Sequence, residues 1–316
     1  MVRKLISDDE IIIGILTIED IKFEKKSTAR RILGIITTLI ITLLITNYFN
    51  FIMIIFSREQ YVNSIISRFP SFLPISKQFF FLMSIILSII LTSAVVLTFI
   101  NKKIGILNEL RGVGRKKIIT FSEAFYIAFF GSLVSVYLFP IVPTTDNISF
   151  ENLIFYGYFA VAIAPLLEET IFRFVFLVLP VAIKEFMHGD KRRAKAIVIS
   201  GKDRLEMYDY IFILISSLVF GIAHLMGGWS FNKIFQATFL GLFLAYIALK
   251  GGIFVSIAFH WMWNALSTLL LISLLMDPYS ASFFIAALGI IYFAIILFGV
   301  VETIILILRE VFKFDV

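Results

Sequence analysis

The sequence predicts an all-α polytopic membrane protein with about eight transmembrane helices. Hydrophobic residues make up 60% of the 316 residues, and the mean hydropathy is +0.98, which exceeds what a water-soluble domain needs. Apolar runs of about 18 residues or more recur along the chain, and each can cross ~30 Å of hydrocarbon as a helix. Because these runs are continuous and do not alternate apolar with polar residues, a β-barrel is not expected.

Eight apolar segments are long enough to be membrane spans. The fourth and the eighth exceed the thickness of the hydrocarbon, so each must tilt, kink or extend past the membrane. In chain order the eight segments are residues 32–56, 79–100, 119–141, 152–183, 209–226, 231–249, 252–275 and 281–308.

Lysine and arginine residues predict the orientation of the spans. They gather before the first span, in the loop 101–118 and in residues 184–204, whereas loops 142–151 and 276–280 have none. Basic loops remain on the cytoplasmic side, so this multi-pass integral membrane protein should have both termini in the cytoplasm. Residues 1–29 lack the pattern of a cleavable signal peptide, and loop 101–118 is expected to lie partly as an amphipathic helix on anionic lipid.

Composition limits the chemistry that the chain can perform. It contains no cysteine, which excludes disulfides, thiolate catalysis, iron–sulfur clusters and cysteine-ligated zinc. The net charge of +6 is modest and fits cytoplasmic loops better than nucleic-acid binding, so we expect no nucleic-acid partner.

Three charged residues lie in the middle of the fourth span. Each charge near the bilayer centre costs roughly 2.5–3.5 kcal/mol, so their presence needs an explanation. Glu169 and Arg173 are four residues apart on one helix face and can form an ion pair. Glu168 is turned about 100° from Glu169 and is available for another purpose. Pro165, one turn upstream, frees a backbone carbonyl and can kink the helix.

Two of the three histidines also lie within predicted spans. His224 follows Phe220 by one helical turn, and His260 precedes Asn264 by one turn. A single membrane histidine is usually an interhelical hydrogen-bonding group, but two with helix-spaced partners favour a shared site. His188 lies in a basic loop and is expected to be solvated.

These side chains suffice for hydrolysis of an amide inside the membrane. A carboxylate and a histidine can deprotonate a shared water, and His260 and Asn264 can donate hydrogen bonds to an oxyanion. A zinc ion held by Glu168, His224 and His260 is also conceivable. The HExxH pattern is absent, however, and the three ligands would come from three helices. The metal therefore stays undetermined at this point.

Three motifs in order resemble those of one protein family. EETIFR (168–173) fits EExxxR, FGIAH (220–224) fits FxxxH, and HWMWN (260–264) fits HxxxN. Together they resemble the CPBP family of intramembrane proteases, which includes the type II CAAX prenyl endopeptidases (Rce1-like) and the bacterial Abi group. The resemblance covers about residues 150–270.

The resemblance implies eight transmembrane helices around an intramembrane catalytic cavity. It implies Glu168 as the water-activating base with His224 beside it, and His260 with Asn264 as the oxyanion-stabilising pair. Supporting residues would be Glu169, Arg173 and Phe220. Rce1-like enzymes remove the last three residues of prenylated CAAX proteins, whereas Abi proteins have other or unknown targets. A glutamate-type mechanism would require no cofactor.

We therefore predict an intramembrane endopeptidase that acts near the C-terminus of a membrane-associated substrate. Membrane lipids and a membrane-associated protein or prenylated peptide would be its partners. The alternatives are a catalytically silent binding or immunity protein of the same fold, and a proton-coupled transporter, which the lack of an internal repeat disfavours. The expected regions are a cytoplasmic segment 1–29, spans one to three in 30–148, a catalytic core 149–308 and a tail 309–316.

Overall fold

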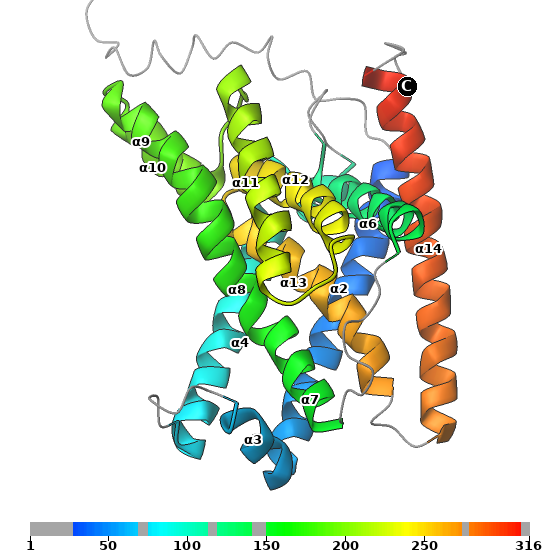
Figure 1. Ribbon diagram of the computed structural model, residues 1–316. Coiled ribbons are helices and arrows are strands. Elements are labelled where there is room, and N and C mark those ends of the chain that lie inside the picture. Colours follow the sequence, from blue (N-terminus) through cyan, green and yellow to red (C-terminus); the bar gives the residue numbers. More distant parts are fainter. Residues whose placement is uncertain (1–27, 69–74, 113–118, 141–149, 274–277, 311–316) are drawn as a thin grey trace, which may run out of the picture.

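The computed structural model describes residues 28–68, 75–112, 119–140, 150–273 and 278–310 (Figure 1). Every regular element in these residues is a helix. The predicted all-α polytopic class is therefore confirmed. Most of the expected segment 1–29 and of the expected tail 309–316 lies outside the described residues, as do residues 113–118 of the basic loop 101–118.

Six described helices are long and apolar enough to cross a membrane, with the last one qualifying over Leu288–Leu308. They are α2 (Thr28–Ser57), α4 (Lys77–Ile100), α6 (Phe121–Leu138), α11 (Met207–Met226), α12 (Lys233–Gly251) and α14 (Pro278–Glu310). These match six of the eight predicted spans. Helix α13 (Ile253–Ser273), at the predicted seventh span, is apolar over Ile253–Leu266 but shorter there.

The predicted fourth span is not one regular helix. It is a chain of five helical pieces, two of which are π-helical: α7 (Phe150–Tyr158), η1 (Phe159–Ile163), α8 (Ala164–Glu168), η2 (Glu169–Val178) and α9 (Leu179–Met187). The remaining short helices are α3 (Glu59–Ile66), α5 (Ile106–Leu110) and α10 (Lys191–Ser200). A total of eight membrane crossings therefore stays a prediction.

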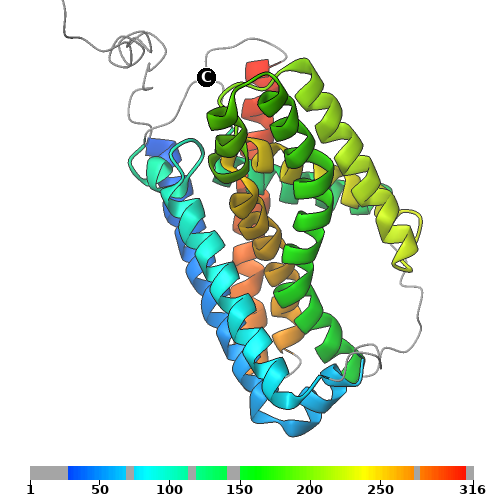
Figure 2. The same ribbon diagram turned by 90° about the vertical axis from the view of Figure 1, so that its left-hand side faces the viewer.

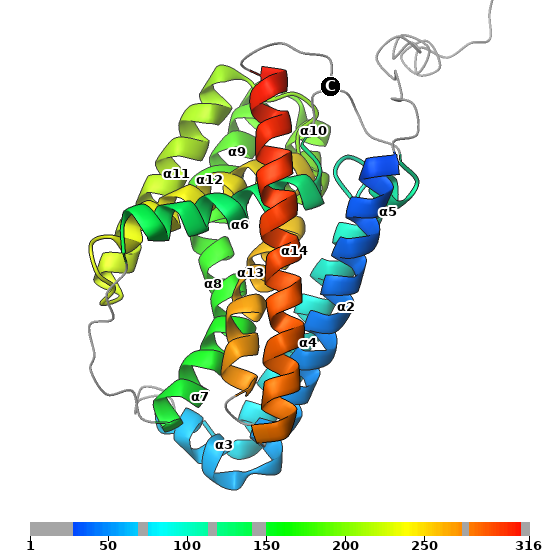
Figure 3. The same ribbon diagram turned by 90° about the vertical axis from the view of Figure 1, so that its right-hand side faces the viewer.

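Helix α13 lies at the centre of the molecule. It packs against α2, α4, α6, α12 and α14 and against the pieces from α7 to η2 (Figures 1 and 3). Its Phe259 meets Phe121 and Phe125 edge-on, with ring centroids 5.5 and 5.4 Å apart. Outward-facing apolar side chains such as Leu39 and Phe293 are well exposed, as lipid contact requires.

Helices α11 and α12 form a close antiparallel hairpin because two glycines allow their backbones to approach. A Cβ atom at Gly221 would lie 2.0 Å from Thr238 Oγ1, and one at Gly241 would lie 3.1 Å from Ser217 Cα. Small residues are the usual means of helix packing in membranes, where burial of apolar surface gives little driving force. This packing fixes the position of the C-terminal turn of α11.

The basic segments gather at one end of the molecule. The start of α2, the short helix α5, the helix α10 and the C-terminal end of α14 all lie at that end (Figures 2 and 3). The two described chain ends are therefore on the same side, as an even number of crossings would require. That this side faces the cytoplasm stays a prediction from the positive-inside rule.

Candidate active site

The glutamate-bearing segment begins with a helical irregularity that Pro165 explains. A regular helix would use the N–H at position 165 to bond the carbonyl of Val161, and a π-helix would use it for Ala160, but proline has no N–H. The Asn264 side chain in α13 donates instead to Ala160 O at 2.9 Å. The missing helical hydrogen bond thus leaves the Ala160 carbonyl free to accept the bond from Asn264, and this bond links η1 to α13.

Glu169 and Arg173 form the ion pair that their spacing predicts. The Arg173 Nε and a Glu169 carboxylate oxygen are 3.6 Å apart, and both side chains are fully buried. The Arg173 nitrogens have no hydrogen-bond partner among the described residues. The guanidinium carbon lies 4.1 Å from the centre of the Phe220 ring, so a cation–π contact supports this buried charge.

Glu169 is held from its other side by α13. His260 Nδ1 lies 2.9 Å from one carboxylate oxygen, and the Ser256 hydroxyl donates to the other. Ser256 was not predicted as a site residue, although the sequence contains the signal. Ser256, His260, Asn264 and Thr268 recur every four residues and form a polar stripe along an otherwise apolar helix.

Glu168 approaches the opposite nitrogen of the same histidine. His260 Nε2 is 3.6 Å from a Glu168 carboxylate oxygen. The Glu168 side chain is 24% exposed, whereas that of Glu169 is 0% exposed. His260 therefore lies between a buried carboxylate and an accessible one. The two glutamates therefore differ in burial, and the division of roles between them stays a prediction.

His224 is oriented by its own helix. Its Nδ1 lies 2.8 Å from the backbone oxygen of Phe220, so Nδ1 carries the proton and Nε2 presents a lone pair. The Phe220 ring meets the rings of His224 and His260 edge-on, with centroids 4.7 and 6.0 Å apart. Phe220 thus contacts both histidines as well as Arg173, which gives the predicted supporting residue a concrete packing role.

Asn264 differs from the other predicted residues because part of its side chain is already engaged. Its amide nitrogen donates one hydrogen bond to Ala160 O. The amide nitrogen carries a second N–H, which an oxyanion could accept from. Asn264 follows His260 by one helical turn, as its position in the motif requires.

The structure does not show a three-ligand metal site in the described residues. Among them, no group of three or more His, Cys, Asp or Glu side chains has the arrangement of a metal site. Glu168 and His260 are close to each other, but His224 does not complete a set with them. We therefore derive no step of the chemistry through a metal ion.

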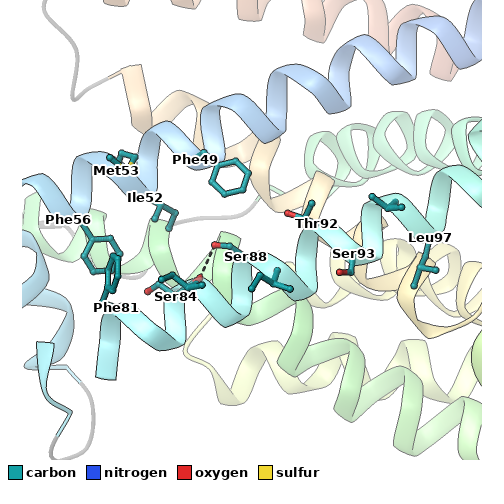
Figure 4. A pocket seen from close by; sticks show the side chains of 13 residues that line it. Phe49, Ile52, Met53, Phe56, Phe81, Ser84, Ser88, Thr92, Ser93 and Leu97 are labelled. Carbon is teal, nitrogen blue, oxygen red and sulfur yellow. Dashed lines mark hydrogen bonds between the residues drawn. The ribbon is translucent and has the colours of Figure 1, made fainter. Parts of the chain in front are cut away.

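A cavity of about 770 Å³ lies between α2 and α4, away from the glutamates (Figure 4). Its lining includes Phe49, Met53 and Phe81, with hydroxyls from Ser84, Ser88 and Thr92. No ionisable side chain lines it. This cavity contains none of the predicted catalytic residues.

One comparison with known proteins finds a match. Residues 150–266 match the family model described as type II CAAX prenyl endopeptidase Rce1-like. All three motifs and the residues from Ala160 to Asn264 lie inside this region, so the resemblance predicted from the motifs is confirmed over this range. Rce1-like similarity indicates an integral membrane protease. Among curated proteins and solved structures, the comparisons find no match.

Proposed function

We propose that this protein is an intramembrane endopeptidase that hydrolyses a peptide bond near the C-terminus of a membrane-associated substrate. The observation that supports the proposal most is the placement of His260 between Glu169 and Glu168 inside the Rce1-like region. A buried histidine between two carboxylates, of which one is accessible, is a typical acid–base arrangement.

In the proposed reaction, Glu168 and His224 position a water molecule. Glu168 takes a proton from the water, while the lone pair on His224 Nε2 accepts a hydrogen bond from it. The water oxygen attacks the carbonyl carbon of the substrate, and a C–O bond forms. The C–N bond then breaks, and Glu168 returns the proton to the leaving amine, so that atoms and charges balance.

His260 and Asn264 are proposed to stabilise the negative charge on the carbonyl oxygen. When protonated, His260 donates from both nitrogens, with Nδ1 directed to Glu169 and Nε2 directed toward the site. Asn264 can add its second amide N–H. Each oxyanion donor in an enclosed site typically contributes about 100- to 1,000-fold to the rate.

The remaining residues are proposed to position His260. Glu169 and Ser256 fix the ring from one side, and Arg173 balances the charge of Glu169. Phe220 supports Arg173 and packs against the histidines. These residues contact one another and none of them needs to touch the substrate, so they are positioning residues.

The first substrate to test is a farnesylated CAAX peptide, since the matched family is described as a CAAX prenyl endopeptidase. Purified protein in detergent is mixed with a fluorogenic peptide of this type, with and without the prenyl group. Wild type, Glu168→Gln and Glu59→Gln are compared, the last as a control glutamate that is highly exposed. A sample of wild type with a strong zinc chelator tests whether a metal is needed.

We expect cleavage by wild type and by Glu59→Gln, and none by Glu168→Gln. Cleavage of the prenylated peptide alone would establish the prenyl requirement. Equal cleavage by Glu168→Gln would overturn the role of that residue. If no peptide of either kind is cleaved while Glu168→Gln keeps full cellular function, a catalytically silent binding protein becomes the better explanation.

A further inference from the structure

A lysine at the start of α12 lies close to the candidate active site. The chain turns back immediately after His224, and Trp229 N donates to His224 O at 3.1 Å. Gly228 makes this turn possible because its φ of +84° is unfavourable for other residues. Helix α12 then begins at Lys233 and packs along α11 through Gly221. The hairpin therefore returns Lys233 toward His224 and Glu168.

Contacts hold the ammonium group of Lys233 in place, but they do not use all of its hydrogen-bond donors. Its Nζ donates to Gln236 Oε1 at 2.6 Å and lies 4.8 Å from the centre of the Trp229 ring. A lysine has three N–H donors, and no other hydrogen-bond acceptor or ion-pairing carboxylate is found for this one among the described residues. Two donors are thus available to a ligand.

The positive charge of Lys233 acts on groups of the candidate active site. The side chain is half-buried and interacts electrostatically with the carboxylate of Glu168 and with His224. The first turn of α12 adds a partial positive charge beside it, because Asn232 makes no side-chain cap to the helix. An ammonium in the membrane is costly unless it has a partner of opposite charge, and the Glu168 carboxylate supplies part of that charge. The two unused N–H donors of Lys233 remain available to a second anion.

We propose that Lys233 binds the free C-terminal carboxylate of the peptide substrate. The inference rests on the proposed endopeptidase function and adds the feature of the substrate that is recognised. An extended peptide advances about 3.3 Å per residue, so an anchored carboxylate sets how far from the chain end the scissile bond lies. Lys233 would then be a specificity residue, while Glu168 performs the chemistry.

The test compares two peptides of identical sequence, one ending in a carboxylate and one in an amide. The ratio of kcat/KM between them is measured for wild type, Lys233→Met and Lys233→Arg. Lys195→Met is the control because Lys195 is exposed on α10. We expect wild type and the control to prefer the carboxylate peptide by about 10- to 100-fold, the value of a hydrogen bond to a charged group.

Lys233→Met should lose most of this preference, so that its ratio of kcat/KM between the two peptides falls toward one, and Lys233→Arg should retain the preference. Equal cleavage of both peptides by wild type would overturn the inference and leave the protease function intact. So would a Lys233→Met variant that slows both peptides by the same factor, since the lysine would then act only through Glu168. If wild type cleaves neither peptide, the proposed function fails along with the inference.

Discussion

The buried pair of Glu169 and Arg173 allows a quantitative test of how the site is held together. At 3.6 Å and an effective dielectric constant of about 20, the two charges attract by about 4–5 kcal/mol. Desolvation of both groups offsets much of this energy, so the net contribution of the intact pair is small. Removal of one partner is different, because it leaves the other charge buried and unpaired at a cost of about 3–5 kcal/mol.

The two single changes should not cost the same. In Arg173→Met, Glu169 still accepts hydrogen bonds from Ser256 and His260, so the destabilisation should lie near the lower end of that range. In Glu169→Gln, Arg173 loses its ion-pair partner and keeps the cation–π contact with Phe220 and a weaker attraction to Glu168. The cost should therefore lie near the upper end.

A double-mutant cycle isolates the interaction. The variants Glu169→Gln, Arg173→Met and their combination are unfolded in mixed micelles by increasing SDS, with tryptophan fluorescence as the signal. We expect the double variant to be more stable than the sum of the single effects predicts, with a coupling energy of about 2–3 kcal/mol. The exposed pair Lys77 and Glu59 serves as control and should show almost no coupling. Single effects that add up to the double effect would refute the reasoning.

Two further predictions concern buried carboxyl groups, one inside the site and one outside the spans. Ser256→Ala removes a hydrogen-bond donor to the buried Glu169, and we expect about 1–3 kcal/mol of destabilisation, measured by SDS titration. Peptide cleavage should show a lower kcat with little change in KM. A rise in KM alone would contradict a positioning role for Ser256. Outside the spans, burial raises the pKa of Glu109 from its ordinary 4.5 to about 7, against two hydrogen bonds from Ser122. A carboxyl with a raised pKa stabilises the fold below about pH 4.5, and this stability is lost as the pH rises through about 7. The loss should reach about 3 kcal/mol and be absent in Glu109→Gln, which SDS titrations at several pH values would show.

The helical period of the sequence accounts for much of the site. Glu169 and Arg173 pair because residues four apart share a helix face, and the same spacing brings His260 and Asn264 onto one face of α13. The apolar runs also predict six of the spans to within a few residues, since hydrocarbon thickness imposes their length.

Other contacts could not be predicted because they depend on an irregular helix or on how helices distant in the sequence pack together. The bond from Asn264 to Ala160 exists only because Pro165 changes the hydrogen-bond register of its helix. The proximity of Lys233 to the site could not be predicted, since neither hydropathy nor spacing shows that a hairpin returns it there. The hydrogen bond from Ser256 to Glu169 depends on how η2 and α13 are rotated relative to each other, and helix packing determines that rotation.

The most direct test of the central claim is to ask which bond is hydrolysed and whether Glu168 is required. Wild type and Glu168→Gln are incubated with a membrane-associated CAAX peptide in oxygen-18 water, and the products are analysed by mass spectrometry. Our account predicts one cut near the C-terminus by wild type, with one heavy oxygen in the new carboxylate, and no product from Glu168→Gln. Equal product from both proteins would contradict it.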